Sequence, residues 1–84
     1  MKEVTLVSTK SCPFCPIAKA IWEKLKKEYN FKFKEVDAYS EEGAKLVRKF
    51  GISSVPATII KDEKGERLAF IGVPSEEEAK KEVM

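Results

Sequence analysis

The sequence predicts an α/β domain in which helices cover both faces of a four-stranded mixed sheet. Two observations carry this prediction: the periodic segments follow the order β-α-β-α-β-β-α, and the last two strands are joined by a hairpin signal. The chain has 84 residues, of which 43% are hydrophobic, and this composition supplies one modest core. We therefore expect residues 1–84 to form a single domain with one active site.

The first strand and the first helix are predicted from two apolar segments. Residues 4–8 are apolar on both faces, which is typical of a strand in the middle of a sheet. From Cys12 to Tyr29, apolar residues recur at helical spacing, with Pro13 in the first turn and Asn30 as a left-handed cap. The inward face of this helix is expected to carry Ile17, Ala18, Ile21, Trp22, Leu25 and Tyr29.

The second strand and the second helix follow directly. Residues 31–37 alternate between apolar and polar side chains, as a strand does. Ser40 is a suitable cap for the next helix, and Gly51 is suited to end it. The inward residues of this helix are predicted to be Leu46, Val47 and Phe50. A strand, a helix and a second strand in this order make a right-handed crossover between parallel strands.

The remaining segments predict a hairpin and a short helix. Residues 57–61 and 66–71 read as antiparallel strands joined by residues 62–65, which have turn chemistry. Ser75 and Glu78 form a capping box that opens the final helix, and Ala79 and Val83 are expected to face the core.

Charge and composition limit the classes of partner. Sixteen basic and fourteen acidic residues give a net charge of +2 and are spread along the chain, which argues against a nucleic-acid partner. The alternation of Phe and Lys in residues 31–34 is that of an amphipathic strand. No run approaches the roughly 20 apolar residues of a membrane span, and we expect a soluble, unexported, cytoplasmic protein that is a monomer. Abundant Glu and Lys, one Asn and no Gln or His favour a heat-adapted host, in which intracellular disulfides are common.

The chemistry centres on the two cysteines, Cys12 and Cys15, which the helix prediction places in the first helical turn. Helix N-terminal amides, the helix dipole and nearby Lys10 are expected to lower the pKa of Cys12, whereas burial works against ionisation of Cys15. We therefore expect Cys12 to attack a substrate disulfide and Cys15 to resolve the resulting mixed disulfide. The protein itself should need no cofactor.

The cysteine pair has three other interpretations. A structural staple closing so short a ring would contribute only about 2 kcal/mol, and an ideal helix would have to distort to form it. A metal site would require two chains, because the chain has no His and no third Cys, so a metal-binding module shared across a dimer is an alternative of another class. The third interpretation is a redox-inert adaptor, in which the pKa of Cys12 would be undepressed.

The chain resembles the thioredoxin–glutaredoxin superfamily, specifically its small archaeal and thermophile members, and the resemblance covers nearly the whole sequence. Residues 12–15, Cys-Pro-Phe-Cys, are similar to the glutaredoxin Cys-Pro-Tyr-Cys, with Pro13 and Phe14 between the thiols. Val55 and Pro56 resemble the cis-proline loop of the superfamily, and Gly72 falls where its members often have a glycine after the last strand. The resemblance implies the thioredoxin fold and a substrate-binding role for Val55, Pro56 and Gly72. It implies that Pro56 packs beside the two thiols and that the Val55 backbone pairs with the substrate by strand addition.

Three departures from the superfamily pattern affect the expected mechanism. Leu6 stands where thioredoxins have a buried Asp that assists proton transfer, so the acceptor for the Cys15 proton is unidentified. Residues 72–76 lack the Gly-Gly-x-Asp-Asp pattern of glutathione-binding glutaredoxins. Pro16 is expected to perturb the helix near the site. We expect a reductase of protein disulfides that is recharged by a flavoprotein thioredoxin reductase, with a glutathione-dependent glutaredoxin as the alternative.

Overall fold

The computed structural model describes residues 2–84 and has the predicted order of elements. The strands are β1 (Glu3–Ser8), β2 (Lys32–Asp37), β3 (Ala57–Asp62) and β4 (Gly65–Ile71), and the helices are α1 (Cys15–Glu28), α2 (Glu41–Phe50) and α3 (Glu76–Val83). The strands form one sheet of order β2-β1-β3-β4, in which β1 is parallel to β2 and antiparallel to β3. The predicted four-stranded mixed sheet is confirmed.

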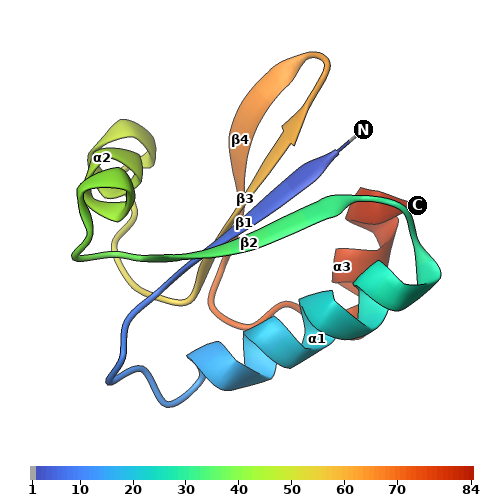
Figure 1. The fold of residues 1–84 in the computed structure, drawn as a ribbon, viewed down its shortest axis with the longest axis horizontal. Helices are drawn as coiled ribbons and strands as arrows, with labels where there is room; N and C mark the ends of the chain where they lie inside the picture. The colour runs from blue at the N-terminus through green and yellow to red at the C-terminus, as the bar shows by residue number, and fades with distance from the viewer. Residues whose placement is uncertain (1) are drawn as a thin grey trace.

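Helices cover both faces of this sheet (Figure 1). On one face, α1 and α3 pack against β1 in a cluster that includes Trp22, Ala79 and Leu6. On the other face, α2 packs against a second cluster around Val7 through its three predicted inward residues, Leu46, Val47 and Phe50. β1 lies inside the sheet and sends alternate side chains into both clusters, which explains why its sequence is apolar on both faces.

Helix α1 begins at Cys15, three residues later than the sequence predicts. Phe14 is its N-cap residue, so Cys12 and Pro13 lie in the connection that precedes the helix. Pro16 falls in the first turn, where a backbone N–H would have no acceptor within the helix. The effect of Pro16 is therefore on where the helix starts, and α1 continues without a break from Cys15 to Glu28.

Two further details of α1 correct the prediction. Ile17 was expected to face inward but is 51% exposed. The buried face is set by residues at intervals of three and four, namely Cys15, Ala18, Trp22 and Leu25. Asn30 does not form a left-handed cap, because the helix ends at Tyr29 in extended backbone with φ −124° and ψ 155°, and positive φ within residues 2–84 occurs only at glycine.

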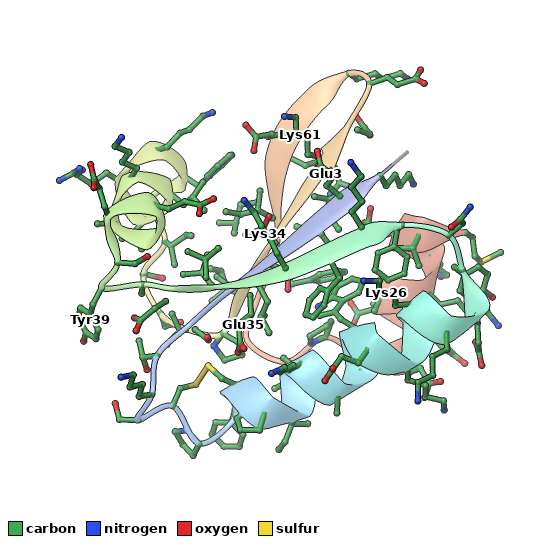
Figure 2. All side chains as sticks on the ribbon, viewed as in Figure 1. Glu3, Lys26, Lys34, Glu35, Tyr39 and Lys61 are labelled. Atoms are coloured by element: carbon green, nitrogen blue, oxygen red, sulfur yellow. A yellow bond between two sulfur atoms is a disulfide. The ribbon has the colours of Figure 1, made fainter. Side chains whose placement is uncertain are left out.

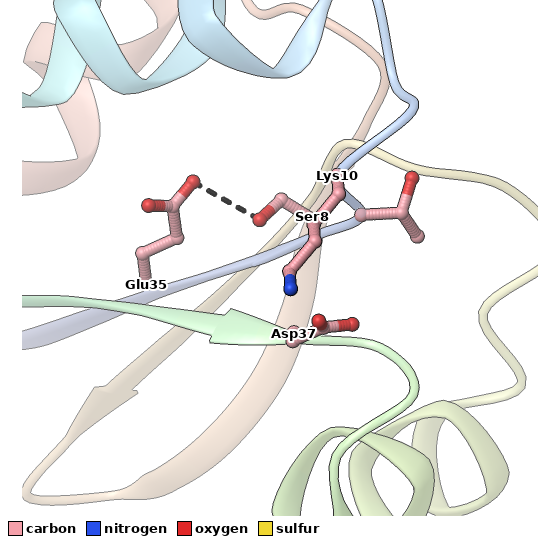
Figure 3. Close-up of a pocket in the computed structure, with 5 residues that line it drawn as sticks. Ser8, Lys10, Glu35 and Asp37 are labelled. Carbon is pink, nitrogen blue, oxygen red and sulfur yellow. Dashed lines mark hydrogen bonds between the residues drawn. The ribbon is translucent and has the colours of Figure 1, made fainter.

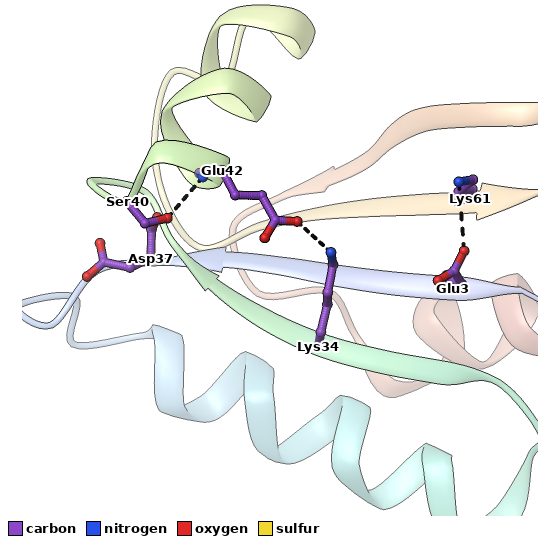
Figure 4. Close-up of polar contacts among 7 residues, drawn as sticks. Glu3, Lys34, Asp37, Ser40, Glu42 and Lys61 are labelled. Carbon is purple, nitrogen blue, oxygen red and sulfur yellow. Dashed lines mark hydrogen bonds and ion pairs between the residues drawn. The ribbon is translucent and has the colours of Figure 1, made fainter.

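The caps of α2 and α3 are as predicted. The Ser40 hydroxyl accepts a hydrogen bond from Gly43 N at 3.0 Å (Figure 4), and Gly51 ends α2 in the left-handed conformation with φ 62°. Ser75 and Glu78 form the reciprocal capping box of α3. These side chains satisfy backbone groups that would otherwise lack partners at the helix ends.

The hairpin between β3 and β4 is tighter than predicted. β3 extends to Asp62 and β4 begins at Gly65, so only residues 63 and 64 form the turn. The Asp62 carboxylate supports this turn by accepting a hydrogen bond from Lys64 N at 2.8 Å. None of the helices within residues 2–84 has the length and the apolar character to cross a bilayer.

Candidate active site

Cys12 and Cys15 are joined by a disulfide at the start of α1. Figure 2 shows it as the yellow bond at the N-terminal end of this helix. The two Cα atoms are 5.4 Å apart, inside the roughly 4.4–6.8 Å range of ordinary disulfides. Because Cys12 lies before the helix, the loop can bring the sulfurs together, and the helix distortion expected from the sequence is not required.

The two cysteines differ in exposure. Cys15 is the first residue of α1, lies on its inward face and is 3% exposed, whereas Cys12 in the loop is only partly buried. An incoming partner therefore reaches Cys12 first.

The electrostatic environment at the start of α1 differs from that of the other helices. The first turn of α1 contains no acidic residue and its last turn contains Lys26 and Lys27. By contrast, the first turns of α2 and α3 carry Glu41, Glu42, Glu76, Glu77 and Glu78. The partial positive charge at the N-terminus of α1 is thus not neutralised by a carboxylate in that turn, and it favours a negative charge on a nearby sulfur.

Only a few amides at this end of α1 can bind such a charge. Pro13 and Pro16 carry no N–H. The next two amides, those of residues 17 and 18, both donate to the carbonyl of Phe14, at 3.1 and 3.2 Å. Within the segment 13–18, the amides of Phe14 and Cys15 are therefore the donors that could face an ionised Cys12.

The cis-proline loop, Val55–Pro56, lies beside the segment that joins β1 to α1, residues 9–14, which we call the cysteine loop. The Val55–Pro56 peptide bond is cis, as the resemblance implies. β1 and β3 pair with Val7 opposite Ala57, so the residues after β1 lie next to those before β3. Accordingly, Thr9 and Val55 line the same cavity of about 290 Å³.

Gly72 is positioned against the same loop. Its N–H donates to the carbonyl oxygen of Pro56 at 2.7 Å, and its φ of 92° is a conformation that side chains rarely adopt. Pro56 is fully buried, whereas Val55 remains partly exposed. The structure thus brings together the three residues that the resemblance assigned to substrate binding.

The surface around the start of α1 carries three exposed apolar side chains next to one lysine. Phe14 and Ile17 are 59% and 51% exposed, and Pro13 and Lys10 are exposed as well. Sequence reasoning assigned Ile17 to the core because its spacing also fits the inward stripe. In the structure the neighbouring residue, Ala18, lies on the buried face of α1.

A polar cavity beside the cysteine loop was missed by sequence reasoning. It has a volume of about 380 Å³ and is lined by Ser8, Thr9, Lys10, Glu35 and Asp37 (Figure 3). A signal was present in β2, where Phe33, Glu35 and Asp37 share one face by alternation, so carboxylates interrupt an apolar face near its carboxyl end. Within residues 2–84, no group of three or more His, Cys, Asp or Glu side chains is arranged to hold a metal ion.

Comparisons with known proteins agree with this fold. The family model described as Glutaredoxin matches residues 4–65. A protein described as Probable Thioredoxin from Archaeoglobus fulgidus is 35% identical over 78 residues, which cover 93% of this chain and 81% of that protein. The chain belongs to the thioredoxin–glutaredoxin superfamily.

Solved structures show the same superfamily fold. The oxidised mitochondrial thioredoxin 3 of Saccharomyces cerevisiae is similar with a TM-score of 0.81 and 17% identity, covering 98% of this chain and 76% of that one. A mutant thioredoxin of Halobacterium salinarum is similar with a TM-score of 0.82 and 16% identity, covering 98% and 71%. The superfamily, the fold and the Cys12–Cys15 pair together support dithiol–disulfide oxidoreductase chemistry at this site.

Proposed function

We propose that this protein reduces disulfides of other proteins and is itself reduced by a flavoprotein thioredoxin reductase. The observation that carries the proposal is the unequal placement of the two sulfurs: Cys12 lies partly exposed before α1, and Cys15 lies buried at its first residue. An accessible attacking sulfur and a sheltered resolving sulfur are what a two-step thiol–disulfide exchange requires.

The reaction begins with both cysteines reduced. The Cys12 thiolate attacks one sulfur of the substrate disulfide, forms a mixed disulfide and releases the other substrate sulfur as a thiolate. Cys15 then loses its proton and attacks the sulfur of Cys12, which restores the Cys12–Cys15 disulfide and releases the second substrate sulfur. The substrate gains two electrons and two protons, and the protein is left oxidised.

The cis-proline loop provides a docking edge for an extended substrate segment. Within residues 2–84, the backbone hydrogen bonds outside the regular elements do not involve the N–H or C=O of Val55. An extended chain can therefore pair with Val55 by strand addition, while the exposed side chains of Phe14 and Ile17 contact its apolar residues. Pairing through the backbone reads little sequence, so we expect several protein clients.

The proposed reductant follows from residues 72–76 and from the relatives. The sequence after β4 is Gly-Val-Pro-Ser-Glu, which lacks the paired Asp residues of glutathione-binding glutaredoxins. The Archaeoglobus relative is described as a thioredoxin, although the matching family model is that of glutaredoxin. Glutathione therefore remains the alternative reductant, and one assay separates the two.

The assay measures reduction of insulin disulfides with either thioredoxin reductase and NADPH or glutathione and glutathione reductase. We expect turnover with the first system and little with the second. Cys12→Ser should abolish turnover, and Cys15→Ser should trap a mixed disulfide with the substrate. Equal behaviour of the two variants would refute the order of attack. If insulin were not reduced with either system or with dithiothreitol, the proposed enzyme activity would be refuted.

The two interpretations of other classes give different results in simple measurements. A shared metal site predicts about one zinc or iron ion retained per two chains, together with loss of the monomer. An inert adaptor predicts that both cysteines are alkylated with the same pH dependence, near the unperturbed value of about 8.5. Our proposal predicts a lower pKa for Cys12 than for Cys15, because only Cys12 lies before the uncompensated N-terminus of α1.

A further inference from the structure

The second step of the proposed reaction requires a group that accepts a proton from Cys15. Cys15 is 3% exposed, so its thiol has little direct access to bulk water. Leu6 occupies the position from which thioredoxins supply a carboxylate, and its side chain is fully buried in the core. The acceptor must therefore come from another element that faces the start of α1.

Glu35 belongs to β2, and its carboxylate lies between Ser8 of β1 and Lys19 of α1, on the face of the sheet that α1 covers. One carboxylate oxygen accepts a hydrogen bond from the buried Ser8 hydroxyl at 3.0 Å, and the other lies 3.2 Å from Lys19 Nζ. Lys19 follows Cys15 by one helical turn, a spacing that places β-carbons roughly 5–6 Å apart. In Figure 2, Glu35 projects from β2 toward α1.

The register of the sheet gives the same placement. Glu35 is paired with Leu6 in the parallel β1–β2 ladder, so both side chains lie on the α1 side of the sheet. Glu35 and Ser8 also line the polar cavity of about 380 Å³ beside the cysteine loop (Figure 3), which has the size and polarity to hold water. Cys15 does not line this cavity, so proton transfer from Cys15 to Glu35 requires water that extends from the cavity to the start of α1.

The other charged groups around the cavity are poorly suited to accept this proton. Lys10 from the cysteine loop and Lys19 from α1 carry ammonium groups, which donate hydrogen bonds and have no acceptor atom. Asp37 from β2 supports the following turn, where its carboxylate accepts a hydrogen bond from Tyr39 N at 2.8 Å. Glu35 is the carboxylate of this cavity that pairs with a residue of α1, Lys19.

We propose that Glu35 accepts the proton of Cys15, through cavity water, when Cys15 resolves the mixed disulfide. The Cys15 thiol gives its proton to the Glu35 carboxylate, and the thiolate then forms a bond with the sulfur of Cys12. The bond between Cys12 and the substrate breaks, and the departing substrate sulfur takes up one proton. This inference rests on the proposed function and adds a residue to it.

The test separates the two half-reactions with a disulfide-containing peptide whose fluorescence rises on reduction. Formation of the mixed disulfide is measured in the Cys15→Ser background, and resolution is measured in the chain that retains Cys15. Glu35→Gln keeps an oxygen that accepts from Ser8 but removes the basic carboxylate. The matched control is Glu66→Gln, because Glu66 pairs with Lys49 at 3.1 Å and its side chain is 31% exposed, against 34% for Glu35.

We expect Glu35→Gln to slow resolution about tenfold at pH 7 and to leave mixed-disulfide formation unchanged. About 3% of an unperturbed thiol is ionised at pH 7, and burial lowers this fraction for Cys15, so the reaction that proceeds without a base is slow. The deficit should shrink as the pH rises toward and above about 8.5, because a growing fraction of the thiol then ionises without a base. Glu35→Asp, which keeps a carboxylate, should recover part of the rate, and Glu66→Gln should match the wild type.

Two results would overturn the inference. If Glu35 acted only through its charge, its removal would favour the Cys15 thiolate, and Glu35→Gln would resolve the mixed disulfide as fast as or faster than the wild type. A deficit that stayed constant with pH would indicate a structural defect in place of a lost proton acceptor. If the wild type formed no mixed disulfide at Cys12, the proposed function would itself fail, and this result is distinct from the other two.

Discussion

Gly43 in the first turn of α2 is predicted to be intolerant of any side chain. A Cβ atom added there would lie 1.9 Å from the carbonyl oxygen of Asp37, at the end of β2. That oxygen also accepts hydrogen bonds from Ser40, at 3.0 Å from its N–H and 2.6 Å from its hydroxyl. The carbonyl can move away from a new methyl group only by weakening these bonds.

Two opposing terms set the magnitude for Gly43→Ala. Helix propensity favours Ala over Gly by about 1 kcal/mol. Overpacking costs about 1–3 kcal/mol, and weakening the two hydrogen bonds to Asp37 O adds about 1 kcal/mol for each bond lost. The steric terms exceed the propensity term, so we expect a net loss of about 2 kcal/mol in the free energy of unfolding.

Equilibrium unfolding of the oxidised protein in guanidinium chloride measures this loss. The midpoint should fall while the slope of free energy against denaturant stays unchanged. Arg48→Ala is the control, because Arg48 is exposed on the same helix and its replacement should alter stability by less than about 0.5 kcal/mol. A midpoint that rises for Gly43→Ala would mean that propensity decides, and it would refute the close approach of α2 to the end of β2.

Three further substitutions test the core, a cap and the proposed docking surface. Trp22→Phe removes the indole N–H that donates to Thr58 Oγ1 at 3.2 Å, and it should lower the free energy of unfolding, measured by thermal denaturation, by about 2 kcal/mol. Adding Thr58→Val should restore part of this loss, and no recovery would contradict the role of the hydrogen bond. Ser75→Ala removes the α3 capping box and should lower the free energy of unfolding by about 1 kcal/mol. An unchanged unfolding midpoint would contradict a stabilising role for this cap. Ile17→Ser should leave stability within about 0.5 kcal/mol but raise KM for insulin without lowering kcat, whereas an unchanged KM would exclude Ile17 from docking.

The fold was predictable from the sequence because burial in this chain is periodic. The alternation in residues 31–37 and the helical spacing after Cys15 follow from packing against a sheet, and the caps at Ser40, Gly51 and Ser75 are local hydrogen-bonding signals. Periodicity failed at Ile17, because an apolar residue next to an inward stripe can serve either the core or an exposed surface. Only the packed helix decides between the two.

The candidate site was predictable only in part. The cysteine pair and the Val55–Pro56 loop are short motifs that a sequence displays directly. Glu35 is separated from Cys15 by twenty positions, and it reaches the site through the β1–β2 register and the contact with Lys19. A single sequence specifies neither the register nor the contact, so the polar group beside the buried thiol could not be assigned from it.

The late start of α1 explains how two cysteines so close in sequence acquire different environments. If the helix began at Cys12, Pro16 would be its fifth residue, would remove a hydrogen bond to the Cys12 carbonyl and would clash with it, at a cost of about 3 kcal/mol. With Cys15 as the first helical residue, Pro16 falls in the first turn, where proline costs nothing. Pro16 therefore sets the helix start. This start leaves Cys12 in the loop before the helix dipole and turns Cys15 toward the core, so the proposed division of labour between the two sulfurs depends on a proline that takes no part in the chemistry.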